Sequence, residues 1–441
     1  MWTKRRSIHT TQKRSIDDHR SSFERDLTRV IHSPAFRKLQ RKTQILGTNE
    51  GDFHRTRLTH SLEVSSIAKS IVRNLKRRPD AIEELPSDDL ISTISLLHDI
   101  GHPPFGHGGE VALNYQMREH GGFEGNGQTL RLITKCEISY GDCGLNLTRR
   151  TLLGILKYPV AYHKLNKLSY ESLSNNLPLK INDWLPPKCF FDSEQHIVDW
   201  ILSTLPENDQ TTFQNVMIKP TALTHGKSQF KSLDCSLMNI ADDIAYGVHD
   251  FEDAIHLRLI ASRAMNNKRF INIYNKANKN KKLSDCAIMI DNLFNYEQTI
   301  RKSAIGELVN FFITSTSVQL LETHQHFETN LLRHNAVIEP AAKALLEELK
   351  ALIYAHVIDS PEARTIEYGG QTVVLKLFDA VSSNPMSLLD RPTRKKYSEA
   401  TSDSDSVRVI CDYIANMSDE YAYRMHERLF GFNTRTVFER L

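Results

Sequence analysis

The sequence lacks several features that would point to other classes of protein. Its six cysteines form no C-x-x-C pair and no zinc-ribbon spacing, so we expect reduced structural thiols; they lie at positions 136, 143, 189, 235, 286 and 411. No apolar run approaches the roughly 20 residues that a helix needs to span a bilayer. The N-terminal segment MWTKRRSIHTTQKR has no apolar signal-peptide core. We therefore predict a cytoplasmic protein that does not act at a membrane.

The chain as a whole also lacks a strong net charge of either sign, since it has 56 Lys and Arg residues and 53 Asp and Glu residues. The segment 1–42 departs from this balance, because twelve of its residues are Lys or Arg and only four are Asp or Glu. Such a segment is either a solvated arm that docks on a neighbouring subunit or an anion site for a regulatory nucleotide or single-stranded nucleic acid. We favour the arm.

Strand signals are few and short, and the sequence contains no internal repeat. The Gly-Gly pair within 363–381 predicts a short hairpin before a helix. With 441 residues, 40% of them hydrophobic, the chain can bury a large core. These patterns predict an all-α protein with one helical catalytic unit and added C-terminal helices. Helical periodicity recurs over 123–135, 196–205, 284–307, 337–356 and 407–430.

The segment LLHDIGHPPFGHGGE, Leu96–Glu110, concentrates chemically active side chains around a Gly/Pro turn. A helix is expected to begin near Pro86–Asp89 and to end at Gly101, which places His98 and Asp99 in its last turn. The prolines and glycines of the following loop would hold its histidines in place. Such a set can bind a divalent metal and still leave groups for proton transfer. A lone histidine is more often a hydrogen-bonded core or loop residue, but the clustering argues against that interpretation here.

A second segment, Asp52–Val72, carries a candidate partner for this site. Its apolar residues predict an amphipathic helix that begins near Thr59. His60 would then lie in the first turn of that helix, with Arg57 three residues earlier. An imidazole at a helix start is well placed to reach a metal held by the Leu96–Glu110 segment.

A third segment, Met238–Ile255, carries polar groups on one side of an apolar helix. Asp242, Tyr246 and Asp250 recur every four residues and so share one helical face. Two carboxylates and a phenol among buried apolar neighbours are hard to explain as solvated surface. The alternative is an internal hydrogen-bond network that binds no ligand.

The order His60, then His98 and Asp99, then Asp242 resembles the H…HD…D metal-binding set of the HD superfamily of metal-dependent phosphohydrolases. The segments FRKLQRKTQILG, RTRLTHSLEV, HDIGHPPFGHGGE, FEGNGQTLR and ADDIAYGVHDFEDA together are similar to the deoxyguanosine triphosphate triphosphohydrolase (dGTPase) family, including its dGTPase-like bacterial members. The matching segments cover about 36–254. Because five separate segments occur in the family's order, the resemblance is specific, and it implies the helical HD fold.

The resemblance implies hydrolysis of a deoxynucleoside triphosphate, dGTP or several dNTPs, to the deoxynucleoside and tripolyphosphate by water attack at the α-phosphorus. It also implies a divalent metal, Mn²⁺ or Mg²⁺ with Fe or Co as alternatives, with open positions for a water and a phosphate oxygen. A dNTP or single-stranded DNA as a regulator, and a homo-oligomer with four or six subunits, are implied as well. On the family's pattern the metal ligands are His60, His98, Asp99 and Asp242.

Further roles follow from the same resemblance. His107 and Glu110 match the family's proton-handling pair, with the imidazole placed to protonate the leaving 5′ oxygen. His102 is a candidate for a phosphate contact within this catalytic set, and Arg57 resembles the family's phosphate-clamping arginine. A tyrosine ring beneath the sugar would crowd a 2′-hydroxyl and so favour deoxyribose. The residues expected to surround the deoxyribose are Gln44, Tyr246 and Asp250.

We expect three regions: a basic N-terminal arm (1–42), an HD metal-dependent phosphohydrolase core (43–260) and a helical C-terminal region for packing and oligomerisation (261–441). Two other functions stay open. One is another HD-type phosphohydrolase, such as a nucleotidase or phosphodiesterase, and the other is a non-catalytic regulator that binds dNTP or DNA. The presence of His107 and Glu110 beside a complete ligand set argues against the non-catalytic regulator.

Overall fold

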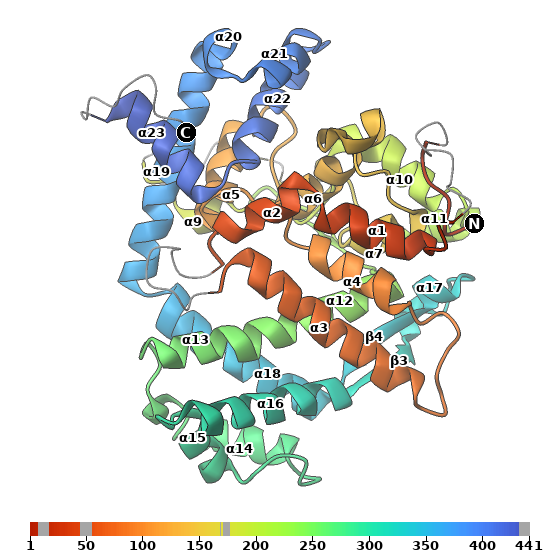
Figure 1. Ribbon diagram of the computed structural model, residues 1–441, viewed down its shortest axis with the longest axis vertical. Helices are drawn as coiled ribbons and strands as arrows, with labels where there is room; N and C mark the ends of the chain where they lie inside the picture. The colour runs from red at the N-terminus through yellow and green to blue at the C-terminus, as the bar shows by residue number, and fades with distance from the viewer. Residues whose placement is uncertain (8–16, 45–54, 168, 171–176, 432–441) are drawn as a thin grey trace.

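Helices dominate the computed structural model of the chain (Figure 1), which describes residues 1–7, 17–44, 55–167, 169–170 and 177–431. Sheet structure in this described part is confined to two small antiparallel pairs and two isolated bridges. The predicted all-α class is confirmed. Across the described residues, no helix is both long and apolar enough to cross a membrane. The strand pairs are β1 (Val216–Ile218) with β2 (Lys227–Ser228) and β3 (Thr316–Leu320) with β4 (His334–Ile338).

Three helices form the centre of the main apolar core. Helix α3 (Arg57–Lys76) packs against both α4 (Asp88–Leu97) and α12 (Leu233–Ile244). It begins at a capping box, in which the hydroxyls of Thr56 and Thr59 each accept a hydrogen bond from the other residue's backbone N–H. Every residue of α4 from position 90 to 97 is buried, so this helix runs through the core rather than along its surface.

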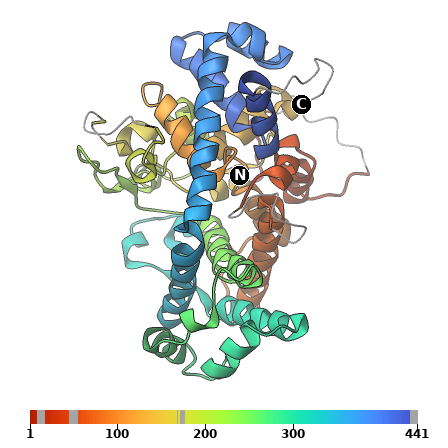
Figure 2. The same ribbon diagram turned by 90° about the vertical axis from the view of Figure 1, so that its left-hand side faces the viewer.

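A second, smaller apolar core lies beside the first. Helix α5 (Gly106–Gln116) packs there against the long helix α19 (Pro361–Ser383), and α22 (Asp403–Ala415) and α23 (Asp419–Phe430) complete it. Figure 2 shows α19 running down one face of the molecule, with its lower end meeting the helices of the main core. Gly101–Phe105 is the short turn that joins the two cores, because Ile100 belongs to the main one and Phe105 to the second.

The remaining α-helices surround these two cores. Their bounds are α1 (Ser22–Ile31), α2 (Pro34–Lys38), α6 (Gly125–Arg131), α7 (Arg149–Ile155), α8 (Tyr162–Leu165), α9 (Ile181–Trp184), α10 (Gln195–Leu202), α11 (Glu207–Phe213), α13 (Phe251–His256), α14 (Lys268–Ala277), α15 (Cys286–Leu293), α16 (Gln298–Thr314), α17 (Asn330–Arg333), α18 (Pro340–Ile353), α20 (Pro385–Leu388) and α21 (Arg391–Ser398). In Figure 1, α14, α15 and α16 form the end of the molecule opposite to α20 and α21.

The hairpin predicted within 363–381 is wrong, because this stretch lies inside the continuous helix α19. One glycine of its Gly-Gly pair, Gly370, serves close packing rather than a turn. A Cβ atom at Gly370 would lie 2.3 Å from the Cβ atom of Phe105, so only glycine lets α19 approach the turn between the two cores.

Two of the predicted helical stretches are each divided in two. The stretch 407–430 breaks between α22 and α23, where Ser418 caps α23 by accepting a hydrogen bond from Tyr421 N. The stretch 284–307 likewise divides into α15 and α16. Periodicity alone missed both breaks because the apolar spacing continues across them.

The described part of the basic N-terminal segment packs on its own chain. Helix α1 lies against α4, and Arg5 forms an ion pair with the buried carboxylate of Asp26. Asp26 also accepts hydrogen bonds from Thr148 and Thr151. Residues 8–16 of the predicted arm lie outside the described residues. Docking of this segment on a neighbouring subunit, and the boundaries at 42/43 and 260/261, stay predictions.

Candidate metal and catalytic site

The four predicted metal ligands lie together at the ends of three helices. His60 comes from the first turn of α3, His98 and Asp99 follow the end of α4, and Asp242 lies near the end of α12. Ligand atoms of His60, His98 and Asp99 all lie within 4.8 Å of one another. Asp242 Oδ1 is 3.2 Å from His60 Nε2 and 3.5 Å from His98 Nε2. Two imidazoles and two carboxylates therefore converge on one point.

The orientation of His98 suits a metal ligand. Its Nδ1 is 2.7 Å from the carbonyl oxygen of Ser95 and donates to it, which leaves Nε2 as the free ring nitrogen. That Nε2 is buried and has no hydrogen-bond partner among the described residues. A buried nitrogen lone pair without a donor is costly in a folded protein. The residues present thus fit a divalent ion at this point.

The electrostatics of the cluster favour a cation. Burial raises the pKa of Asp99, but His98, His102 and Arg57 lower it by more, so that its pKa lies well below the ordinary value. Burial lowers the pKa of His60, whereas the hydrogen bond to Asp242 and the neighbouring carboxylates raise it to about 9. In the metal-free protein the protonated imidazole of His60 thus lies among the carboxylates, and a divalent ion would supply positive charge in place of its proton.

The predicted proton-handling pair lies on α5. His107 Nδ1 is 3.1 Å from Glu110 Oε2. The His107 side chain is 59% exposed, whereas that of Glu110 is fully buried. Burial raises the pKa of Glu110, but Lys188 and the hydrogen bond from His107 lower it well below the ordinary value. An ionised, buried carboxylate that holds an accessible imidazole is an arrangement suited to proton transfer.

The turn before α5 sets the position of this pair. Phe105 and Gly106 both adopt the left-handed conformation, with φ of 62° and 55°. A Cβ atom at Gly109 would lie 1.9 Å from the carbonyl oxygen of Pro104, so the loop can fold this tightly against α5 only with glycine there. Arg57 links the turn to the metal cluster. Its Nη1 is 2.6 Å from Asp99 Oδ2, and its Nη2 would lie 3.6 Å from a Cβ atom at Gly106.

His102 lies between the two groups. Its Nδ1 is 3.2 Å from Asp99 Oδ1, and a Cβ atom at Gly125 would lie 3.5 Å from its Nε2 and 3.4 Å from Glu110 Oε1. Burial lowers the pKa of His102 to about 3, so its imidazole is neutral. A neutral ring here can accept or donate one hydrogen bond without adding charge.

The predicted sugar-binding residues occupy two places around the cluster. Gln44 lines a small cavity of about 90 Å³ together with His107, and its buried Oε1 has no hydrogen-bond partner within the described part of the chain. Tyr246 and Asp250 lie on a π-helical turn, Ala245–Asp250, that interrupts the predicted uniform helix after α12. Burial raises the pKa of Asp250 to about 7. Such turns widen a helix and often occur at functional sites.

Two lysines that the sequence patterns did not single out also reach the site. Lys157 Nζ is 3.5 Å from Asp242 Oδ2, and Lys188 Nζ is 3.3 Å from Glu110 Oε1 and 2.9 Å from Glu124 Oε1. Each lies in a loop and belongs to none of the segments that carried the family resemblance. Only their tertiary contacts identify them.

Comparison with known proteins finds two matching domain families and relatives that cover nearly the whole chain. The HD domain family matches residues 57–138, and the phosphohydrolase-associated domain family matches residues 336–428. A Vibrio cholerae relative, deoxyguanosinetriphosphate triphosphohydrolase-like protein 1, is 45% identical over 94% of each chain. Deoxyguanosinetriphosphate triphosphohydrolase-like proteins from Shewanella woodyi and Shewanella pealeana are 46% and 44% identical over 99% and 100% of this chain and 98% of their own.

Proposed function

Because this chain belongs to the deoxyguanosinetriphosphate triphosphohydrolase-like family of HD-domain phosphohydrolases, we propose that it hydrolyses deoxynucleoside triphosphates to the deoxynucleoside and tripolyphosphate. In this reaction a water oxygen bonds to the α-phosphorus and the bond from that phosphorus to the 5′ oxygen breaks. The observation that carries the proposal is the placement of the His107–Glu110 pair beside the four-residue cluster, with Arg57 between them. The residues that would hold a divalent ion and the proposed proton donor thus lie on either side of one arginine.

The ligands proposed for the ion are His60, His98, Asp99 and Asp242. When bound, a divalent ion such as Mn²⁺ or Mg²⁺ would polarise a phosphoryl oxygen and lower the pKa of a water. Their geometry supports this role, because no donor in the described residues satisfies His98 Nε2 and the carboxylates of Asp99 and Asp242 lie beside the same nitrogen.

His107 is proposed to give a proton to the leaving 5′ oxygen. Its accessible imidazole can meet a substrate, while the buried carboxylate of Glu110 fixes the ring and stabilises its protonated form. Glu110 is itself held by Gly125 N at 2.9 Å and by Lys188. The proton donor is therefore oriented by a chain of buried contacts rather than by solvent.

The cationic groups around the site suit a polyphosphate. Arg57 has Nε buried without a partner among the described residues, and its planar fork of donors matches phosphate oxygens. Lys157 and Lys188 lie close enough to Tyr158 to lower the pKa of its phenol, against the upward effect of burial. We propose that these two ammonium groups neutralise the outer phosphates, while Gln44, Tyr246 and Asp250 surround the sugar.

Product analysis tests this function. The purified protein with Mn²⁺ should release tripolyphosphate from at least one of the four dNTPs, offered singly and mixed, and not from GTP, because the Tyr246 ring would crowd a 2′-hydroxyl. Ion chromatography of the products distinguishes tripolyphosphate from pyrophosphate and orthophosphate. Release of orthophosphate or of a nucleoside monophosphate would contradict the proposal and favour a nucleotidase or phosphodiesterase.

Metal binding should release protons and weaken at lower pH. The pKa of His60 lies near 9 in the metal-free protein, so at pH 7 to 8 an incoming ion must displace the proton from this imidazole. We expect about one proton to be released per bound ion. Below pH 9, the metal affinity should rise roughly tenfold for each unit by which the pH increases. Calorimetric titration with Mn²⁺ in two buffers of different ionisation enthalpy measures both quantities. An affinity independent of pH between 6 and 8 would remove His60 from the ligand set.

A further inference from the structure

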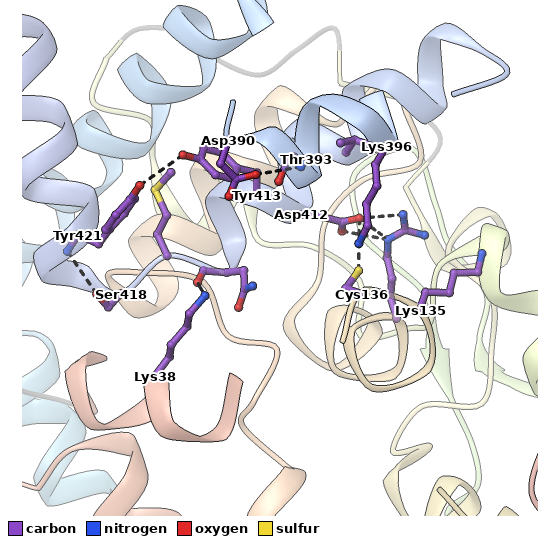
Figure 3. A pocket seen from close by; sticks show the side chains of 14 residues that line it. Lys38, Lys135, Cys136, Asp390, Thr393, Lys396, Asp412, Tyr413, Ser418 and Tyr421 are labelled. Atoms are coloured by element: carbon purple, nitrogen blue, oxygen red, sulfur yellow. Dashed lines mark hydrogen bonds and ion pairs between the residues drawn. The ribbon is translucent and has the colours of Figure 1, made fainter. Parts of the chain in front are cut away.

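A second cavity lies away from the candidate site, at the seam between the N-terminal helices and the C-terminal bundle (Figure 3). Its volume is about 460 Å³, within the range typical of small-molecule sites. Its walls come from α2, from the segment after α6, and from α21, α22 and α23. None of its lining residues belongs to the metal cluster, to the proton-handling pair or to the sugar-binding set.

One end of this seam cavity carries surplus positive charge. Arg131 forms ion pairs there with two carboxylates, those of Asp412 and Glu194, each at 2.8 Å. Lys396 extends from α21 towards them (Figure 3), and no hydrogen bond or ion pair to Lys396 is found in the described part of the chain. Lys135 adds a further ammonium, which forms an ion pair with the buried carboxylate of Glu194 at 3.2 Å. The ammonium of Lys396 is thus the surplus positive charge at this end, and such a group can attract a phosphate.

The other end presents aromatic surface. The hydroxyls of Tyr413 and Tyr421 lie 3.5 Å apart, and the side chain of Met417 is buried behind them. Ser418 and Asn416 supply polar atoms at the edge of this wall. An aromatic wall with a few polar groups is suited to a flat heterocyclic ring.

From these two ends we infer that the seam cavity binds one phosphorylated aromatic compound of the size of a mononucleotide. The phosphate would lie against Lys396 and Lys135, and the ring against Tyr413 and Tyr421. The enclosed volume admits a single such unit, so a polynucleotide is the weaker match.

The floor of the seam cavity also supports the catalytic loop. Lys38 donates to the Asn416 carbonyl in this floor at 3.0 Å. One residue earlier, the Ala415 carbonyl accepts from Lys42, whose ammonium also donates to the carbonyl of His102. Asp419, three residues after Asn416, accepts hydrogen bonds from Phe105 N at 3.1 Å and from Thr43 N at 2.9 Å. A ligand that shifts residues 415–419 would therefore move the turn that carries His102 and His107.

Binding of dAMP, which has one ring and one phosphate, tests the inference. We compare its affinity by calorimetry with that of deoxyadenosine and of inorganic tripolyphosphate, and we map it by hydrogen exchange. We expect dAMP to bind more tightly than either comparison compound. It should slow exchange in 131–136 and 413–421 and alter exchange in the 101–107 loop. Because binding is read directly, the result does not depend on turnover of any dNTP.

Two neighbouring lysines give a matched pair of variants. Lys396→Glu should weaken dAMP binding about tenfold or more, because a charge-assisted contact becomes a repulsion. Lys395→Glu should leave it unchanged, since Lys395 is exposed and pairs with Glu399 on the surface. Equal affinities in the two variants, no measurable dAMP binding, or protection confined to 98–110 would each overturn the inference.

Discussion

Asp242→Ala should abolish both metal retention and turnover. Asp242 faces His60 and His98 from a separate helix, so its loss removes one of four ligands and the carboxylate that orients both imidazoles. Loss of a residue that only hydrogen-bonds to a metal ligand costs roughly 10–100-fold in metal affinity. Loss of a ligand itself should cost more. Metal content after dialysis and tripolyphosphate release from a dNTP measure the two effects.

Asp243→Ala is the matched control for this variant. Asp243 is the next residue of α12 and is similarly exposed, but its carboxylate contacts Lys350 at 2.9 Å and Asn239 at 3.2 Å, away from the cluster. We expect it to retain metal and activity. If the Asp242 variant still holds one tightly bound ion, the assignment of this residue as a ligand is wrong.

His107→Ala should keep its metal and its substrate affinity but lose turnover. A general acid of this kind contributes roughly 10²–10⁴-fold to the rate, and His107 is the accessible member of the pair with Glu110. The loss should appear in kcat with little change in KM, because the imidazole acts on the leaving oxygen in the transition state. Steady-state kinetics together with metal analysis separate this effect from loss of the ion.

His163→Ala provides the comparison. His163 is 63% exposed and also pairs with a carboxylate, that of Asp192, yet it lies outside the site. A variant at this position should behave as the unmodified protein does. If the turnover of the His107 variant stays within a factor of about three of normal, a role in proton transfer is contradicted, because the loss of rate is then far smaller than expected.

The local features of the site were readable from the sequence. Ser87 and Gly101 bracket α4, so His98 and Asp99 had to emerge at its end. The Gly/Pro composition of 101–109 likewise required a tight turn before α5. Both conclusions depend only on short-range backbone chemistry, which a sequence expresses directly. The same local reasoning failed at Gly370, because close packing between helices and a turn both require glycine.

Tertiary structure decided which groups meet. His60 and Asp242 are 182 residues apart and lie 3.2 Å from each other, a contact that the family resemblance implied but periodicity cannot show. Lys157 and Lys188 entered the site from loops without any recognisable pattern, and the seam cavity arose from elements at both ends of the chain.

The sequence by itself therefore determined the all-α class, the ends of α4 and the set of candidate reactive side chains, since these follow from composition, local propensity and capping. The folded structure alone decided the division into two apolar cores and the turn, Gly101–Phe105, that joins them. That arrangement results from how side chains distant in the chain pack against one another, and packing is not encoded in any single segment.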